Sequence, residues 1–223
     1  MKAALYLSSL TLVALPIEVP AQSPQAIIDR AVSAYARLTS MRADFRQTLT
    51  NPLTGTTQTT TGSILRRKPN LLNISFNNGD RVAADGTTLW VYLPSSAPGQ
   101  VIRVPYNNGN AGSVDPADQF LDSPRTRYTI GDAGTGTIAG RATHALTLVP
   151  KRQNSAFTRG KVWIDDADYS IRQFEIESST GLTRRVVITS FTANPKVDRA
   201  SFRFVVPRGA RIVDQSALAG AAY

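Results

Sequence analysis

The 223-residue chain contains a single histidine and no cysteine, which limits the chemistry that its side chains could perform. His144 lies between Thr143 and Ala145 in a segment with strand-like alternation, where a lone histidine is more often packed or solvated than catalytic. A Ser-His-Asp triad would need this histidine as its general base, and the sequence has no Ser-x-x-Lys pair. Zinc and iron sites lack their usual ligands. We therefore predict no catalytic residue, no metal site and no cofactor.

Two other motifs could bind a ligand. Residues 165–168 (DDAD) carry three carboxylates, which are ligands for hard cations. They lie between two predicted strands, however, where a hairpin turn is the simpler interpretation. Residues 134–140 (GTGTIAG) superficially resemble a phosphate-binding loop, but no strand-helix-strand unit surrounds them. We interpret both segments as hairpin loops.

The elements that would position these residues begin with a helix. Ser23 has the character of an N-cap, and Pro24 suits the first helical position. Apolar residues then fall on one face at helical spacing, which predicts a helix over residues 24–39. A second, short helix is expected to start at residues 115–116 and to contain Phe120 and Leu121.

From residue 41 the apolar residues recur with a period of two, which predicts strands. Asn-Gly at residues 78–79 and Asp-Gly at 85–86 are strong hairpin signals. Around eleven short strands with few helices predict an α+β fold whose antiparallel sheet curls into a barrel. After two strands that end near residue 68, the main predicted strands cover residues 71–76, 87–93, 100–104, 128–130, 144–149, 161–164, 171–178, 183–192 and 202–206.

The strand over residues 89–93 (LWVYL) is apolar on both faces, so both faces must be covered. Eleven strands enclose more space than side chains readily fill. Apolar residues facing such a space, with helices across it, would form a pocket for lipid. An ordinary β-sandwich core explains the same pattern equally well.

Residues 1–21 have the pattern of a cleavable secretory signal: Lys2, an apolar stretch over residues 3–15, and small residues near Ala21. An unstructured tail is the alternative. We expect residues 22–223 to form one soluble domain in the periplasm, without a lipid anchor because there is no cysteine. The net charge of +9 favours acidic partners or membranes, and no nucleic-acid motif is present.

Five short motifs, in order along the chain, resemble the LolA family of outer-membrane lipoprotein carriers. Residues 43–48 (ADFRQT) are similar to its "ADFxQ" signature, and residues 85–92 (DGTTLWVY) to its "DG-x-x-LW-x-Y" hairpin. The other three are GSIL followed by KPN at residues 62–65 and 68–70, LVPK at 148–151, and FRFVVPRG at 202–209.

The resemblance implies an incomplete, strongly curved antiparallel barrel, lidded by short helices over a hydrophobic cavity. It implies a non-catalytic periplasmic chaperone, expected to be a monomer. Such a carrier takes acylated lipoproteins from an ABC-type releasing complex in the inner membrane to the outer-membrane receptor LolB. The candidate cavity residues are Phe45, Leu49, Ile64, Leu72, Ile74, Phe76, Trp90 and Tyr92, and the candidate lid residues are Tyr35, Leu38, Phe120 and Leu121.

One position departs from the family pattern. The family usually has arginine before the Pro-Asn pair, where it helps to close the lid, and this chain has Lys68. Lysine keeps the charge but loses the planar donor fork. Lys68 is our candidate release switch. Two alternatives remain open: a LolA-like domain that binds another lipid or senses envelope stress, and a hydrolase that depends on His144.

Overall fold

The computed structural model describes residues 22–106, 116–152 and 157–215. The expected signal peptide, residues 1–21, lies outside the described residues. The first helix, α1, spans Pro24–Ala36, and the side chain of Ser23 accepts a hydrogen bond from the Ala26 amide at 3.2 Å, as an N-cap does. The helix ends three residues before the expected limit. The carboxamide of Asn194 accepts the Thr39 N–H at 2.8 Å and holds the chain in the extended form that enters the first strand.

Twelve strands form a single sheet in the order β12-β6-β5-β4-β3-β2-β1-β11-β10-β9-β8-β7. All neighbours pair antiparallel except β12 and β6, which are parallel. The strands are β1 Ser40–Asn51, β2 Thr56–Arg67, β3 Leu71–Phe76, β4 Arg81–Asp85, β5 Thr88–Tyr92, β6 Gln100–Pro105, β7 Tyr128–Ile138, β8 Arg141–Pro150, β9 Arg159–Asp165, β10 Ile171–Glu177, β11 Thr183–Ala193 and β12 Arg211–Asp214.

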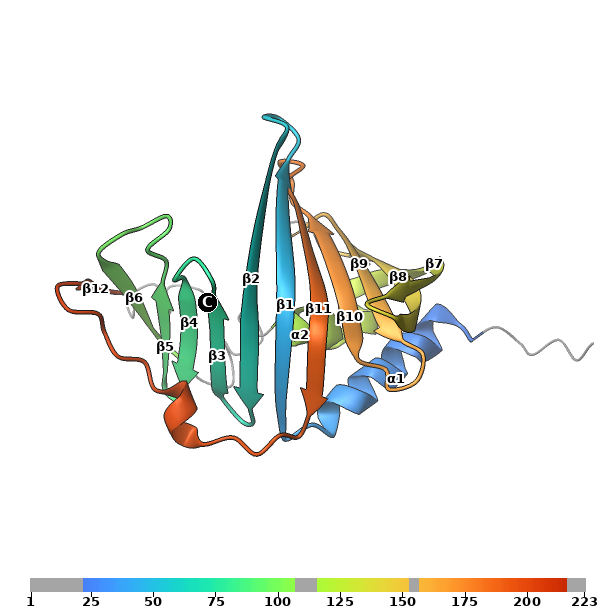
Figure 1. The fold of residues 1–223 in the computed structure, drawn as a ribbon. Helices are drawn as coiled ribbons and strands as arrows, with labels where there is room; N and C mark the ends of the chain where they lie inside the picture. Colours follow the sequence, from blue (N-terminus) through green and yellow to red (C-terminus); the bar gives the residue numbers. More distant parts are fainter. Residues whose placement is uncertain (1–21, 107–115, 153–156, 216–223) are drawn as a thin grey trace, which may run out of the picture.

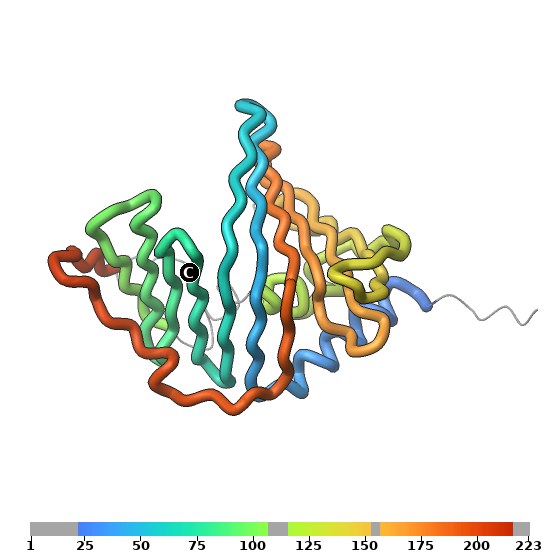
Figure 2. The backbone as a smooth tube through the Cα atoms, viewed as in Figure 1, coloured from blue at the N-terminus to red at the C-terminus, as the bar shows by residue number. Residues whose placement is uncertain are grey.

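The sheet is strongly curved and does not close into a barrel, because β7 and β12 remain at its two ends (Figures 1 and 2). Two short helices follow β6: α2 at Pro116–Leu121 and α3 at Pro124–Arg127. Helix α2 lies within the concave side of the sheet, and α1 contacts α2, β7 and β9 (Figure 1). The expected incomplete barrel with short helices is confirmed. No helix in the described ranges is long and apolar enough to cross a membrane.

Two local expectations were wrong. The segment 134–140 is not a loop: β7 continues to Ile138, and the turn is confined to Ala139 and Gly140, which both have positive φ as a tight two-residue hairpin turn requires. Gly134 and Gly136, which suggested a loop, occupy the strand, and Gly140 lies in the turn. The expected strand at residues 202–206 is also absent. A 3-10 helix, η2, covers Arg199–Phe202, and the chain after it runs along the outer face of β4 and β5.

The turn at residues 165–168 is a hairpin turn, as expected. The Asp165 carboxylate accepts the Ala167 N–H at 2.9 Å and hydrogen bonds from two guanidinium groups, Arg141 at 2.7 Å and Arg172 at 2.8 Å. Its oxygens are therefore occupied by protein donors. Within the described ranges no group of three potential metal ligands comes together.

The core lies between the concave face of the sheet and the helices. Along β1 the buried side chains alternate with exposed ones: Met41, Ala43 and Phe45 point inward. Gly62, the partner of Phe45 on β2, leaves room for the Phe45 ring, because a Cβ there would lie 2.6 Å from Cζ of Phe45. Phe45 then meets Phe76 edge to face, with ring centroids 5.3 Å apart.

Candidate functional site

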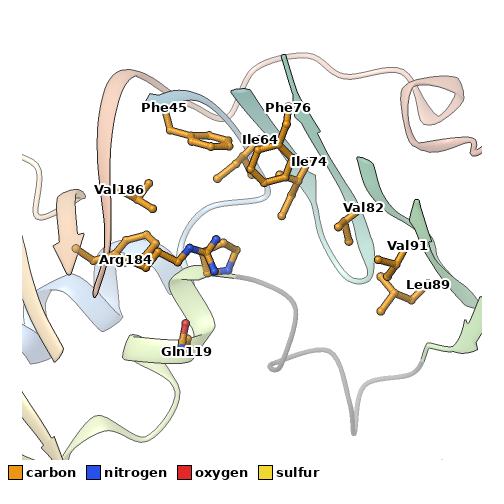
Figure 3. Close-up of a pocket in the computed structure, with 12 residues that line it drawn as sticks. Phe45, Ile64, Ile74, Phe76, Val82, Leu89, Val91, Gln119, Arg184 and Val186 are labelled. Carbon is orange, nitrogen blue, oxygen red and sulfur yellow. The ribbon is translucent and has the colours of Figure 1, made fainter. Parts of the chain in front are cut away.

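An apolar cavity of about 280 Å³ lies between the concave face of the sheet and α2 (Figure 3). Strands on both sides of β1 contribute to its wall, while Pro116 and Gln119 come from α2. The sheet residues that line it are Phe45, Ile64, Ile74, Phe76, Val82, Leu89, Val91, Phe174, Arg184 and Val186. The cavity exists because strands β1 to β5 and β10 to β11 bend around the helix instead of packing flat against a second sheet.

Four of the eight predicted cavity residues line this space: Phe45, Ile64, Ile74 and Phe76. Two others point to the same side of the sheet without reaching the cavity. Leu72, two residues before Ile74, is 2% exposed and packs in the hydrophobic core. Leu49 is partly buried farther along β1.

The structure places Trp90 and Tyr92 outside the cavity, which corrects the prediction. The Trp90 ring stacks on Phe204 of the C-terminal segment, with centroids 5.6 Å apart and planes 12° apart, and its indole N–H donates to Asp85 at 3.1 Å. Tyr92 lies against the same phenylalanine. Because side chains alternate along a strand, Leu89 and Val91 face the cavity instead. Both faces of β5 are covered, as expected, but the face that carries Trp90 and Tyr92 is the outer one.

Several lining residues were not predicted, because sequence alternation identifies the two faces of a strand without saying which face is concave. Phe174 on β10 and Val186 on β11 lie directly opposite each other in the register. Both belong to strands that the sequence predicts. Only the curvature of the sheet shows that they meet the same space as Phe45.

The predicted lid residues lie between the helices and the sheet. Phe120 of α2 is fully buried, with its ring 5.1 Å from Phe174 and 6.0 Å from Phe157. Leu121 is also buried. Tyr35 of α1 lines a smaller cavity beside α2, and Leu38 packs at the margin of the core.

Two cations at the end of β2 connect the sheet to these helices. The Lys68 ammonium donates to the carbonyl oxygens of Ala36 at 2.6 Å and Tyr35 at 3.3 Å, so it caps the C-terminal end of α1. Two residues earlier, the Arg66 guanidinium contacts the Asp118 carboxylate of α2 at 3.4 Å. Sequence reasoning singled out Lys68 but missed Arg66, which the alternation of β2 places on its inward face.

The cavity also contains a cation. The Arg184 Nε donates to the side-chain oxygen of Gln47 at 2.8 Å, and its guanidinium points into the cavity (Figure 3). Burial lowers the pKa of Arg184 below its usual value, because the apolar surroundings disfavour the charged form. Neither residue was predicted to belong to the site.

His144 does not line the cavity. It lies on β8, with Nε2 3.3 Å from the Asp132 carboxylate of the neighbouring strand β7. This geometry gives His144 an ordinary cross-strand contact, at a distance from the space that a ligand would occupy.

Comparison with known proteins agrees with this architecture. The family model for "Outer membrane lipoprotein carrier protein LolA" matches residues 36–205. Among curated proteins named outer-membrane lipoprotein carrier protein, one from Methylobacillus flagellatus is 24% identical, with 83% of this chain and 88% of that protein aligned. One from Shewanella woodyi is 25% identical over 92% of this chain and 96% of that protein.

Solved structures show the same fold at low identity. An uncharacterized conserved protein from Thermus thermophilus superposes with a TM-score of 0.56 at 15% identity, covering 87% of this chain and all of that one. MucB superposes with a TM-score of 0.51 at 15% identity, covering 82% of this chain and 62% of that one. The family match spans most of the chain, including the cavity strands and helix α2, and we conclude that the chain belongs to the LolA family of outer membrane lipoprotein carrier proteins.

Proposed function

We propose that this protein is a periplasmic lipoprotein carrier that binds acyl chains in the cavity between the sheet and α2. The observation that supports this most directly is the cavity itself, whose wall is built mainly from aliphatic and aromatic side chains on seven strands. The names of the curated relatives support the same cargo. The proposed path runs from the ABC-type releasing complex of the inner membrane to the outer-membrane receptor LolB, with the carrier acting as a monomer and without catalysis.

The physical need for a carrier is large. Each buried methylene contributes about 0.8 kcal/mol, so one acyl chain of about fifteen carbons costs roughly 10 kcal/mol when it is exposed to water. A lipoprotein with exposed chains would not cross an aqueous space alone. A carrier must offer comparable apolar surface and must later give the chains up.

The size of the cavity points to a lid that moves. Its volume of about 280 Å³ is slightly below the range of roughly 300–1,000 Å³ that is usual for ligand pockets. Loading of a long chain would therefore displace α2 and α1 from the sheet. The Lys68 and Arg66 contacts favour the closed form, and their recovery on release would compensate part of the lost acyl contact.

A release assay tests the proposal. Purified protein without residues 1–21 is added to spheroplasts of the native host, and the supernatant is probed for lipoproteins. We expect lipoproteins to appear in a complex with the protein. A folded protein that releases none, and that fails to bind an environment-sensitive apolar dye, would contradict both the carrier role and the acyl-chain cavity.

The alternatives are distinguished by what the protein carries. The fold alone is shared with MucB, so a LolA-like domain that binds another lipid or senses envelope stress stays the second candidate. Mass spectrometry of lipid copurified from the native host would separate it from a lipoprotein carrier. An activity lost in His144→Ala would favour the hydrolase.

A further inference from the structure

Arg184 places a positive charge against an otherwise apolar wall. It lies on β11, where it alternates with Val186 and so points to the concave side of the sheet. Its Nε is used in the hydrogen bond to Gln47. Within the part of the chain that the structure describes, this is the one hydrogen bond that the Arg184 side chain makes, and it has no ion pair there, so the N–H groups on its two terminal nitrogens are available to a ligand.

Two other guanidinium groups with little exposure differ from Arg184, because each has a carboxylate partner. Arg172 pairs with Asp165 and Asp168, and Arg66 pairs with Asp118. Arg185, the next residue on β11, points outward and pairs with Glu175. Moving a cation out of water without a counter-charge costs desolvation free energy. If this position served only to complete an apolar wall, an arginine would therefore give no benefit.

A second polar group faces the same space from the lid. Gln119 of α2 lines the cavity opposite the sheet, and its side-chain amide has no hydrogen-bond partner among the described residues (Figure 3). The amide can donate two hydrogen bonds. The cavity therefore has apolar walls on β2 to β5 and a polar end where Arg184 and Gln119 present donors.

We propose that this polar end binds the anionic head of an amphiphile, a carboxylate or a phosphate, whose tail lies along Ile64, Ile74 and Val82. The inference rests on the proposed acyl-chain cavity and adds a ligand class to it. The guanidinium fork matches both anions, and the surrounding apolar side chains strengthen the contact by excluding water. The Gln47 hydrogen bond orients the fork toward the cavity.

Displacement of an apolar dye by matched amphiphiles tests this. The probes are dodecanoate, dodecyl phosphate and dodecanol, which share one tail and differ in the head. We expect the native protein to bind the two anions about tenfold more tightly than the alcohol, the effect of one hydrogen bond to a charged group. In Arg184→Met the ratio of anion to alcohol affinity should fall toward one, and in Arg184→Lys it should be intermediate.

Arg185→Met is the matched control, because it removes the same charge from the neighbouring position on the outer face. It should keep the native ratio, which separates local binding from attraction by the net charge. Equal affinity for anions and alcohol in the native protein, or an unchanged ratio in Arg184→Met, would overturn the anion site while leaving the acyl cavity intact. If no probe displaces the dye, the acyl cavity itself is refuted. A preference for dodecanoate over dodecyl phosphate would indicate a fatty acid, and the reverse a phospholipid.

Discussion

Individual side chains on β1 to β3 create the hollow. Gly62 allows the Phe45 ring to lie over the strand, and Phe45 and Phe76 meet edge to face at the cavity wall. Ile64 and Ile74 are direct partners in the β2–β3 register and form the adjacent wall. These large apolar side chains pack against side chains on adjacent strands of the same sheet. Because no second sheet faces them, space remains that a ligand can occupy.

Ile74→Glu should abolish binding of acyl chains while most of the fold is kept. Ile74 is 7% exposed and lines the cavity, so the substitution places a carboxylate in apolar surroundings at a cost of several kcal/mol or with a raised pKa. A hollow tolerates this better than a packed core, because the carboxylate can keep some water. Displacement of the dye by an acylated peptide, together with circular dichroism, measures both effects.

Ser63→Glu is the control, because Ser63 neighbours Ile64 on β2 and is exposed on the outer face. It should bind acylated peptide as the native protein does. Complete unfolding of Ile74→Glu, with a normal Ser63→Glu, would mean that this wall is an ordinary core.

At the scale of the element, the β9–β10 turn is held by the Asp165 carboxylate. Burial by itself would raise the pKa of Asp165, but the hydrogen bonds from Arg141, the Ala167 amide and Arg172 outweigh it and hold the pKa well below the usual 3.8. Since the folded state favours the ionised form, the stabilisation is present above pH 3.8 and is lost as the pH falls below that value toward the folded pKa.

Asp165→Asn should lower the free energy of unfolding by about 3 kcal/mol at neutral pH, because two guanidinium groups lose a 1% exposed partner. Urea unfolding at a series of pH values checks this. The difference from the native protein should shrink as the pH falls below 3.8. Asp166→Asn, in the same turn but exposed, should change little. A constant difference across this pH range would rule out the assigned ionisation.

A second feature at this scale is the contact between Lys68, which directly follows β2, and the end of α1. The Lys68 ammonium donates to the Ala36 carbonyl at the end of the helix and to the Tyr35 carbonyl, which also accepts the Leu38 N–H. Lys68→Leu removes this donor and adds apolar surface near the lid. We expect normal or better loading with lipoprotein but slower transfer to the outer-membrane receptor, because the empty form closes less well.

Lys68→Arg supplies the matched comparison, because it keeps the charge and restores the donor fork. It should transfer as fast as the native protein or slightly faster. Transfer is measured as the rate at which loaded carrier passes a lipoprotein to purified receptor. A native rate in Lys68→Leu would show that Lys68 is a solvated charge without a role in release.

At the scale of the whole molecule, the net charge of +9 affects the rate at which the protein meets acidic partners and membranes. Such a charge speeds approach to acidic membranes and partners, and salt screens it over about 8 Å at physiological ionic strength. The cavity wall is mainly apolar. Raising the salt concentration should therefore slow lipoprotein transfer, while the affinity for a neutral apolar dye changes little. Equal salt sensitivity of both would mean that the charge acts on the cavity itself.

Local patterns in the sequence were enough to determine most elements. The cap at Ser23, the alternation from residue 41 and the Asn-Gly and Asp-Gly pairs predict α1, most strands and several hairpins, because these signals depend on near neighbours. The motifs at residues 43–48 and 85–92 are local as well, and they indicate the family to which the chain belongs. Local rules failed in two places. The glycines hid a tight hairpin in which β7 pairs with β8, and residues 202–206 follow the outer face of β5, a contact between segments far apart in the chain.

The cavity depended on the tertiary structure. Alternation separates Leu89 and Val91 from Trp90 and Tyr92, but either pair could have faced inward. The curvature of the sheet and the Phe204 segment decided that Leu89 and Val91 line the cavity. The concave face has less room for large rings, and on the outer face Trp90 and Tyr92 pack against Phe204. The tertiary structure also decided that Arg184 belongs to the cavity. Its position in the chain resembles that of any strand arginine, and only the fold brings it to the space beneath α2.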